Sequence, residues 1–132
     1  MVDIYPLLDQ IRELLPADTP AYLVGGAVRD LLLGRPLHDL DFVLPGDGMA
    51  AGRAAANRLG GAYFPLDEEH QTARVVLVLP DGSRLNLDFA AQRGADLESD
   101  LRARDFTINA IAIPLNDLKK LNDPLGLSLI HI

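Results

Sequence analysis

The stretch Tyr22-Leu-Val-Gly-Gly-Ala-Val-Arg-Asp30, followed by Asp39-Leu-Asp-Phe42, decides how this chain folds. A short apolar run that ends in two glycines is typical of a buried strand that turns directly into a helix. The second run predicts another strand, in which residues two apart lie on one face. We therefore expect Asp39 and Asp41 to share a face, while the apolar residues that alternate with them face the core.

Similar patterns extend in both directions from this stretch. The expected strands are 21–24, 40–44, 62–65, 73–79, 84–90 and 111–113, and the expected helices are 5–15, 27–33, 49–59, 97–102 and 106–111. Gly34 is expected to close the helix before it, and Pro80-Asp-Gly-Ser83 to form a hairpin turn. This mixture predicts an α/β (α+β) domain with one mixed sheet flanked by helices.

Composition limits the class of protein. The 132 residues suit one domain, the net charge is −7, and cysteine is absent, which excludes disulfides and thiolate metal sites. No apolar run approaches the ~20 residues that span a bilayer, and no signal peptide is visible, so we expect a cytoplasmic protein without membrane attachment. Because nucleic-acid-binding surfaces are usually basic, a long RNA contact is expected mainly outside this chain.

The glycine pair predicts a place for phosphate. Gly25 and Gly26 let the backbone approach an anion without a Cβ in the way, and the following helix offers free N–H groups. Arg29, one turn further on, can pair with a phosphate oxygen. The alternative is an ordinary strand-to-helix turn in which Arg29 pairs with Asp30 or another acid, and for a lone Gly-Gly that alternative is favoured.

Three carboxylates form the second expected site. Asp39 and Asp41 can converge on one Mg²⁺, a cation that favours carboxylates together with substrate phosphates. Asp88 completes the cluster if its strand lies beside residues 40–44, where it can accept a proton or help hold a second metal. The alternatives are solvent-facing acids at a strand start and an ordinary exposed strand position. His38 is expected to be a surface or outer residue, because Mg²⁺ prefers oxygen.

A third group follows in the run Asp100-Leu-Arg-Ala-Arg-Asp-Phe-Thr-Ile-Asn-Ala110. Arg104 can contact a triphosphate, Asp105 can orient an arginine, and Asn109 can bond a sugar hydroxyl or buried backbone. The alternative is a capped helix with a solvated charged face. The run Glu68-Glu-His70 is interpreted as a solvated loop and not as a metal site.

Three ordered motifs, Leu23-Val-Gly-Gly-Ala-Val-Arg-Asp-Leu-Leu-Leu-Gly34, His38-Asp-Leu-Asp-Phe42 and the run 100–110, resemble the catalytic head domain of the bacterial tRNA nucleotidyltransferase (CCA-adding enzyme) and poly(A) polymerase family. That family belongs to the DNA polymerase beta nucleotidyltransferase superfamily, whose fold the resemblance implies. It also implies a Mg²⁺-dependent enzyme that transfers a nucleotide from ATP or CTP to an RNA 3′ end, tRNA above all.

The resemblance implies roles for individual residues. Asp39 and Asp41 match the metal-binding pair, and Asp88 matches a position that usually carries the third acid. Residues that match the nucleotide-binding set are Gly25, Gly26, Arg29, Arg104, Asp105 and Asn109.

The chain also departs from the family pattern. Ala103 stands where an arginine is common, and no match to the helical neck that selects CTP or ATP is found, so CCA addition and polyadenylation are not distinguished. We expect a head domain over residues 1–126 and a larger parent enzyme. In the apolar tail over 127–132, either a strand finishes or the chain is truncated or non-native. The other possibility is a nucleotide-binding or interaction module on the same scaffold without independent catalysis.

Overall fold

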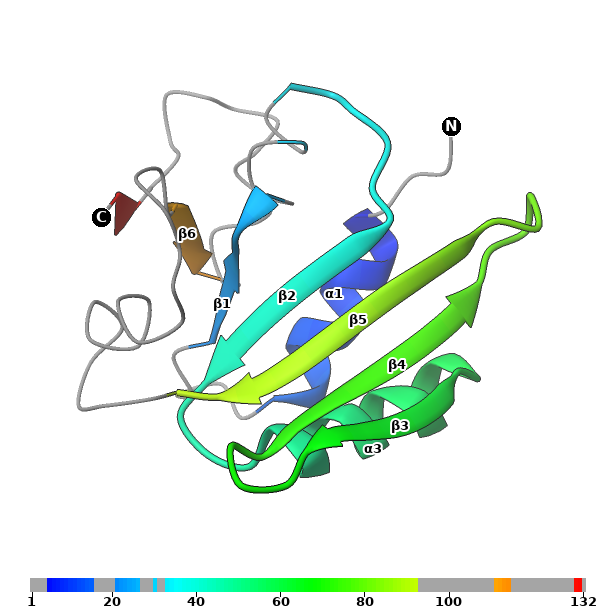
Figure 1. Cartoon of the computed structure of the whole chain (residues 1–132). Helices are drawn as coiled ribbons and strands as arrows, with labels where there is room; N and C mark the ends of the chain where they lie inside the picture. Colours follow the sequence, from blue (N-terminus) through cyan, green and yellow to red (C-terminus); the bar gives the residue numbers. More distant parts are fainter. Residues whose placement is uncertain are drawn as a thin grey trace.

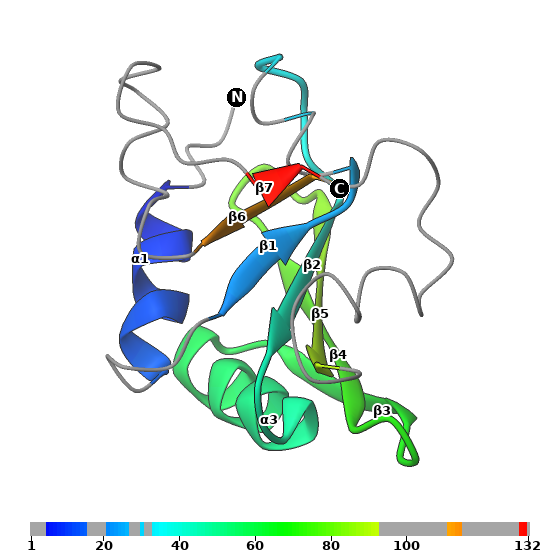
Figure 2. The same ribbon diagram turned by 90° about the vertical axis from the view of Figure 1, so that its left-hand side faces the viewer.

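The computed structural model describes residues 5–15, 21–26, 30, 33–92, 111–114 and 130–131. Within them the chain forms one sheet of seven strands in the order β3-β4-β5-β2-β1-β6-β7 (Figure 1). The strands are β1 Tyr22–Val24, β2 Asp39–Leu44, β3 Ala62–Asp67, β4 Thr72–Val78, β5 Arg84–Ala91, β6 Ile111–Pro114 and β7 Ile130–His131. The helices α1 (Tyr5–Leu14) and α3 (Gly48–Leu59) lie on one side of the sheet (Figures 1 and 2).

The sheet is mixed, as the sequence predicts. β2 and β5 run parallel, whereas every other pairing between the described strands is antiparallel. Parallel neighbours need a long connection. Here the chain leaves β2, forms α3 and the hairpins of β3, β4 and β5, and returns to lie beside β2. Two segments far apart in sequence therefore form the centre of the sheet.

Alternation along the strands makes one face of the sheet apolar. Leu40 and Phe42 of β2 and Leu87 and Phe89 of β5 are all buried, and the two phenyl rings stack with centroids 5.1 Å apart. They belong to one cluster with Ile11 of α1 and other apolar residues of both helices. Each such side chain contributes roughly 1.5–3 kcal/mol by burial. This packing fixes which residues of β2 and β5 face the other way.

Two glycines, Gly34 and Gly60, adopt a left-handed backbone, and Gly60 follows the end of α3. Gly60 has φ 72° after α3, and Gly61 N–H donates to Ala56 O at 3.0 Å. Gly34 has φ 67°, and Arg35 N–H donates to the carbonyl of Asp30 at 2.8 Å. Both contacts are the six-to-one hydrogen bond of a Schellman motif. The second one turns the chain toward β2.

The expected elements within the described residues are confirmed, with shifts of one or two residues at their ends. β3 is longer than expected because Leu66 and Asp67 continue the strand past an irregularity in its pairing with β4. Gly26 and Asp30 are helical, but most of the helix expected over 27–33 and the helix expected over 97–102 lie outside the described residues. So does the helix expected over 106–111 except for Ile111, which begins β6 instead. In the described part of the chain, no helix is long and apolar enough to cross a membrane.

Candidate metal and nucleotide site

The three acids that the sequence singles out lie on the face of the sheet opposite α1 and α3, which is turned toward the viewer in Figure 1. The parallel register of β2 and β5 sets Asp41 directly beside Asp88, and Asp39 beside Asn86. Adjacent strands are about 4.8 Å apart. Asp39 is exposed, while Asp41 and Asp88 are half-buried. Asp88 was expected to join the two other acids only if its strand lies beside residues 40–44, and β5 does lie beside β2.

Arg74 of β4 completes the row on the far side of Asp88. Its Nε and Nη2 donate to the two carboxylate oxygens of Asp88 at 2.8 and 3.0 Å. The hydrogen bond to Asp88 raises the pKa of Arg74, burial opposes that rise, and the charges of Asp88, Asp39 and Asp41 add to it. The cation therefore lies within the field of all three acids.

Sequence reasoning missed Arg74, although a signal for it exists. The turn between β4 and β5 sets Leu79 opposite Ser83, with Leu79 N–H donating to Ser83 O at 2.8 Å. Counting the same number of residues outward along each strand brings Arg74 opposite Asp88. The position of the hairpin turn in the sequence is therefore enough to predict that Arg74 lies opposite Asp88.

Asp39 is held by its neighbour on β5. The side-chain amide of Asn86 donates to Asp39 Oδ1 at 2.9 Å, and the backbone N–H of Asn86 donates to the carbonyl of His38 at 2.9 Å. These two contacts fix the beginning of β2 against β5. His38 itself is exposed. Asn86 is a second residue that the sequence reasoning did not select for the site.

The glycine turn lies at the same end of the sheet as Asp39. Val24, the last residue of β1, pairs with Asp41, and β1 and β2 are antiparallel. The chain past Val24 therefore continues toward the Asp39 end of β2. Gly25 adopts φ 80°, a left-handed conformation that favours glycine, and Gly26 is already helical. The turn and the carboxylates consequently lie on neighbouring strands.

The other nucleotide-binding residues expected from the sequence are not placed. Arg29, Arg104, Asp105 and Asn109 lie outside the described residues.

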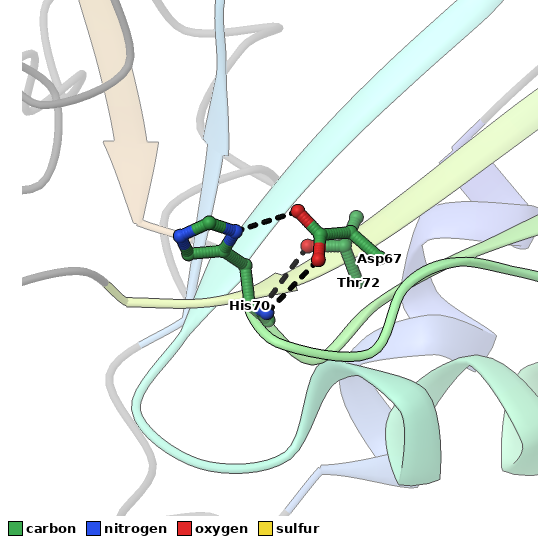
Figure 3. A network of polar contacts seen from close by, with 3 residues as sticks. All are labelled: Asp67, His70 and Thr72. Carbon is green, nitrogen blue, oxygen red and sulfur yellow. Dashed lines mark hydrogen bonds and ion pairs between the residues drawn. The ribbon is translucent and has the colours of Figure 1, made fainter.

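A separate polar group lies at the turn between β3 and β4 (Figure 3). Ligand atoms of Asp67, Glu69 and His70 lie within 4.8 Å of one another. Asp67 accepts hydrogen bonds from the backbone N–H of His70 at 3.2 Å and contacts its imidazole, and Thr72 Oγ1 donates to His70 O at 3.2 Å. Because β3 is three strands from β2, this group is roughly 14 Å from Asp41 across the sheet. It is a solvated turn stabilised by its own side chains.

Comparison with known proteins defines the family. Residues 21–128 match the model of the poly A polymerase head domain, and the chain belongs to this family. It is 49% identical over 106 residues to the CC-adding tRNA nucleotidyltransferase of Geobacter sulfurreducens, a match that covers 80% of this chain and 24% of that protein. Its identity to the A-adding tRNA nucleotidyltransferase of Deinococcus radiodurans is 47% over 116 residues, covering 87% and 25%.

Solved structures agree with these relatives. A tRNA nucleotidyltransferase in complex with a primer tRNA and an incoming ATP analogue matches with a TM-score of 0.66 and 36% identity. That match covers 95% of this chain and 34% of the other. The fold is therefore that of the nucleotidyltransferase head, as expected from the motifs. The chain spans about a quarter of the curated relatives and a third of the solved one.

Proposed function

We propose that this chain is the catalytic head of a metal-dependent tRNA nucleotidyltransferase. The observation that carries the proposal is the row of carboxylates on the open face of the sheet, where Asp41 and Asp88 lie side by side and Asp39 lies two residues along β2. Nucleotidyl transfer requires such a group to hold a divalent cation against a triphosphate. The glycine turn after β1 lies beside this row and offers backbone to the phosphates.

The donor set fits Mg²⁺. All three side chains offer carboxylate oxygens, which are the ligands this hard cation prefers. Asp39 and Asp41 would hold the ion, and Asp88 would add a third carboxylate from the adjacent strand. When bound, Mg²⁺ neutralises phosphate charge and polarises the phosphoryl group.

The reaction proposed is attack of an RNA 3′-hydroxyl on the α-phosphorus of ATP or CTP. A new phosphodiester bond forms, and the bond to pyrophosphate breaks. The turn at Gly25 and Gly26 would hold the triphosphate, and Arg29, Arg104, Asp105 and Asn109 are proposed to complete the nucleotide site. Arginines beside the phosphates would offset the charge that develops in the transition state.

The nature of the substrates is proposed from the relatives. Their names include CC-adding and A-adding tRNA nucleotidyltransferases, which supports CTP or ATP as donor and tRNA as acceptor. The net charge of −7 favours RNA binding mainly through other parts of a longer protein. A cytoplasmic location accords with this proposal and stays a prediction.

A second candidate is a nucleotide-binding module without independent catalysis. It is favoured by the small share of the relatives that this chain spans. Calorimetry with CTP or ATP and Mg²⁺ combined with an incorporation assay tests it, because a module of this kind binds nucleotide but incorporates none.

A chimaera tests the enzyme proposal. This chain would replace the matching head of the Geobacter sulfurreducens relative, and incorporation of radiolabelled CTP and ATP into a tRNA lacking its terminal CCA would be measured. We expect Mg²⁺-dependent incorporation that Asp41→Ala abolishes. Glu69→Ala, which removes the same charge at the turn between β3 and β4, should leave it within about twofold. Incorporation that survives Asp41→Ala contradicts the proposal.

A further inference from the structure

We propose that Arg74 is a positioning residue of the carboxylate site: its guanidinium fixes Asp88 beside Asp41. This inference rests on the proposed function and assigns a role to a residue outside the three motifs. Arg74, Asp88 and Asp41 occupy facing positions on the consecutive strands β4, β5 and β2. Asp88 therefore has a cation on one side and a like charge on the other.

The geometry of the contact is that of a fork. Two nitrogens of Arg74 each donate to a different oxygen of Asp88, at 2.8 and 3.0 Å. Such a bidentate pair fixes the carboxylate plane as well as its position, which a single hydrogen bond does not. A carboxylate has about four lone-pair sites, so the fork leaves roughly two for another partner. Asp88 is thus oriented and still able to act as a ligand.

The charges in the row explain why a fixed orientation is needed. Asp39, Asp41 and Asp88 together carry three negative charges on two adjacent strands. Like charges this close repel and favour outward rotation of the side chains. Arg74 removes part of that repulsion, whereas the neutral amide of Asn86 holds Asp39 through a single hydrogen bond. Arg74 combines a positive charge with two side-chain hydrogen bonds to the same acid.

A purely structural role for the pair is the alternative. Exposed ion pairs contribute little to stability, and this one is partly exposed, with 38% of the Arg74 side chain and 19% of the Asp88 side chain accessible. The backbones of β4 and β5 are already paired at six pairs of facing residues. Joining β4 to β5 therefore does not require the pair, whereas fixing Asp88 does.

The first test is metal binding by the 132-residue chain, with Mn²⁺ as the probe in calorimetry. We expect Arg74→Gln and Arg74→Lys both to weaken Mn²⁺ binding, roughly tenfold, because lysine keeps the charge but lacks the fork. Arg84→Gln is the matched control: it removes the same charge from the exposed start of β5 and should not weaken binding. If Arg74 acted only as a charge, Arg74→Gln would tighten binding and Arg74→Lys would have no effect, and either result overturns the proposal.

The second test is turnover in the chimaera. Arg74→Gln and Arg74→Lys should lower kcat roughly 10–100-fold, with KM for CTP changed less than about twofold, since Arg74 would orient an acid and not bind nucleotide. If kcat is unchanged in both variants while Asp41→Ala loses activity, the role of Arg74 is disproved and the proposed function is not. Activity that survives in Asp41→Ala would instead disprove the proposed function, so the two failures are distinguishable.

Discussion

Asp41 and Asp88 lie directly beside each other on the only parallel pair of neighbouring strands among the described residues, although 47 positions separate them in sequence. Their side chains share the face that no described helix covers. Two carboxylates in such positions repel each other unless a cation lies close by. This relationship gives the first prediction.

Asp41→Asn should uncouple stability from Mg²⁺ without unfolding the chain. We expect Mg²⁺ to raise the Tm of the unmodified chain, because a ligand that binds only the folded state stabilises it, and to leave the Tm of the variant unchanged. Without Mg²⁺ the variant should still unfold in one cooperative transition, because the substitution keeps the shape of the side chain and leaves the buried face of β2 unchanged. Thermal unfolding with and without Mg²⁺ measures both effects, and an equal Mg²⁺ response in the two chains would contradict the metal assignment.

Asn86→Ala should raise the Mg²⁺ concentration that activity requires. The variant loses the 2.9 Å hydrogen bond that fixes Asp39, a contact of about 1 kcal/mol. We expect the apparent Mg²⁺ requirement of the chimaera to rise several-fold, and the free energy of unfolding to change by about 1 kcal/mol. A Mg²⁺ titration of CTP incorporation checks this. An unchanged Mg²⁺ requirement would show that Asp39 needs no such support.

Gly48→Ala should destabilise the fold where α3 meets the end of β5. A Cβ at this position would lie 2.3 Å from the carbonyl oxygen of Gln71 and 2.7 Å from that of Phe89, both backbone atoms. Overpacking of this kind costs about 1–3 kcal/mol. Gly82→Ala is the comparison: nothing lies within 4 Å of its Cβ, but its φ is 86°, so its smaller cost comes from the backbone alone. Urea unfolding ranks the two, and equal costs would show that α3 does not approach β5 this closely.

The turn in Figure 3 predicts a local pH dependence. The hydrogen bond from the His70 side chain lowers the pKa of Asp67 below its ordinary value of 3.8, although burial opposes this shift. A depressed carboxyl pKa stabilises the fold above the unfolded value and loses that effect as the pH falls through the folded one. In an NMR titration Asp67 should therefore titrate below pH 3.8, and at a higher pH in His70→Ala. Identical titration in both chains would exclude the contact in solution.

Much of the fold follows from local sequence. The alternation in Leu40 and Phe42 predicts the buried face of β2, and therefore the exposed face that carries Asp39 and Asp41. Gly60 ends α3, and Gly34 adopts the left-handed backbone expected of it, for a steric reason that is visible in the sequence. These features depend on residues a few positions apart.

It is harder to predict from the sequence that Asp41, Asp88 and Arg74 lie side by side across the sheet. The position of Asp88 beside Asp41 depends on which strands become neighbours, and no turn connects β2 directly to β5. The pairing of Arg74 with Asp88 is predictable from the tight turn that sets the register of β4 and β5. The apolar residues around Arg74 indicate only a strand. The roles of Arg29, Arg104, Asp105 and Asn109, and the domain boundary at residue 126, stay predictions.

The parallel pairing of β2 with β5 also has a consequence for folding. The connection that brings Asp41 beside Asp88 contains α3, β3 and β4. Contacts so distant in sequence carry a large loop-closure cost and form late. A chain in which β5 has not yet docked has no complete set of carboxylates. Under the proposed function, divalent-cation affinity would therefore report the finished sheet, and cation binding would favour that last step of folding.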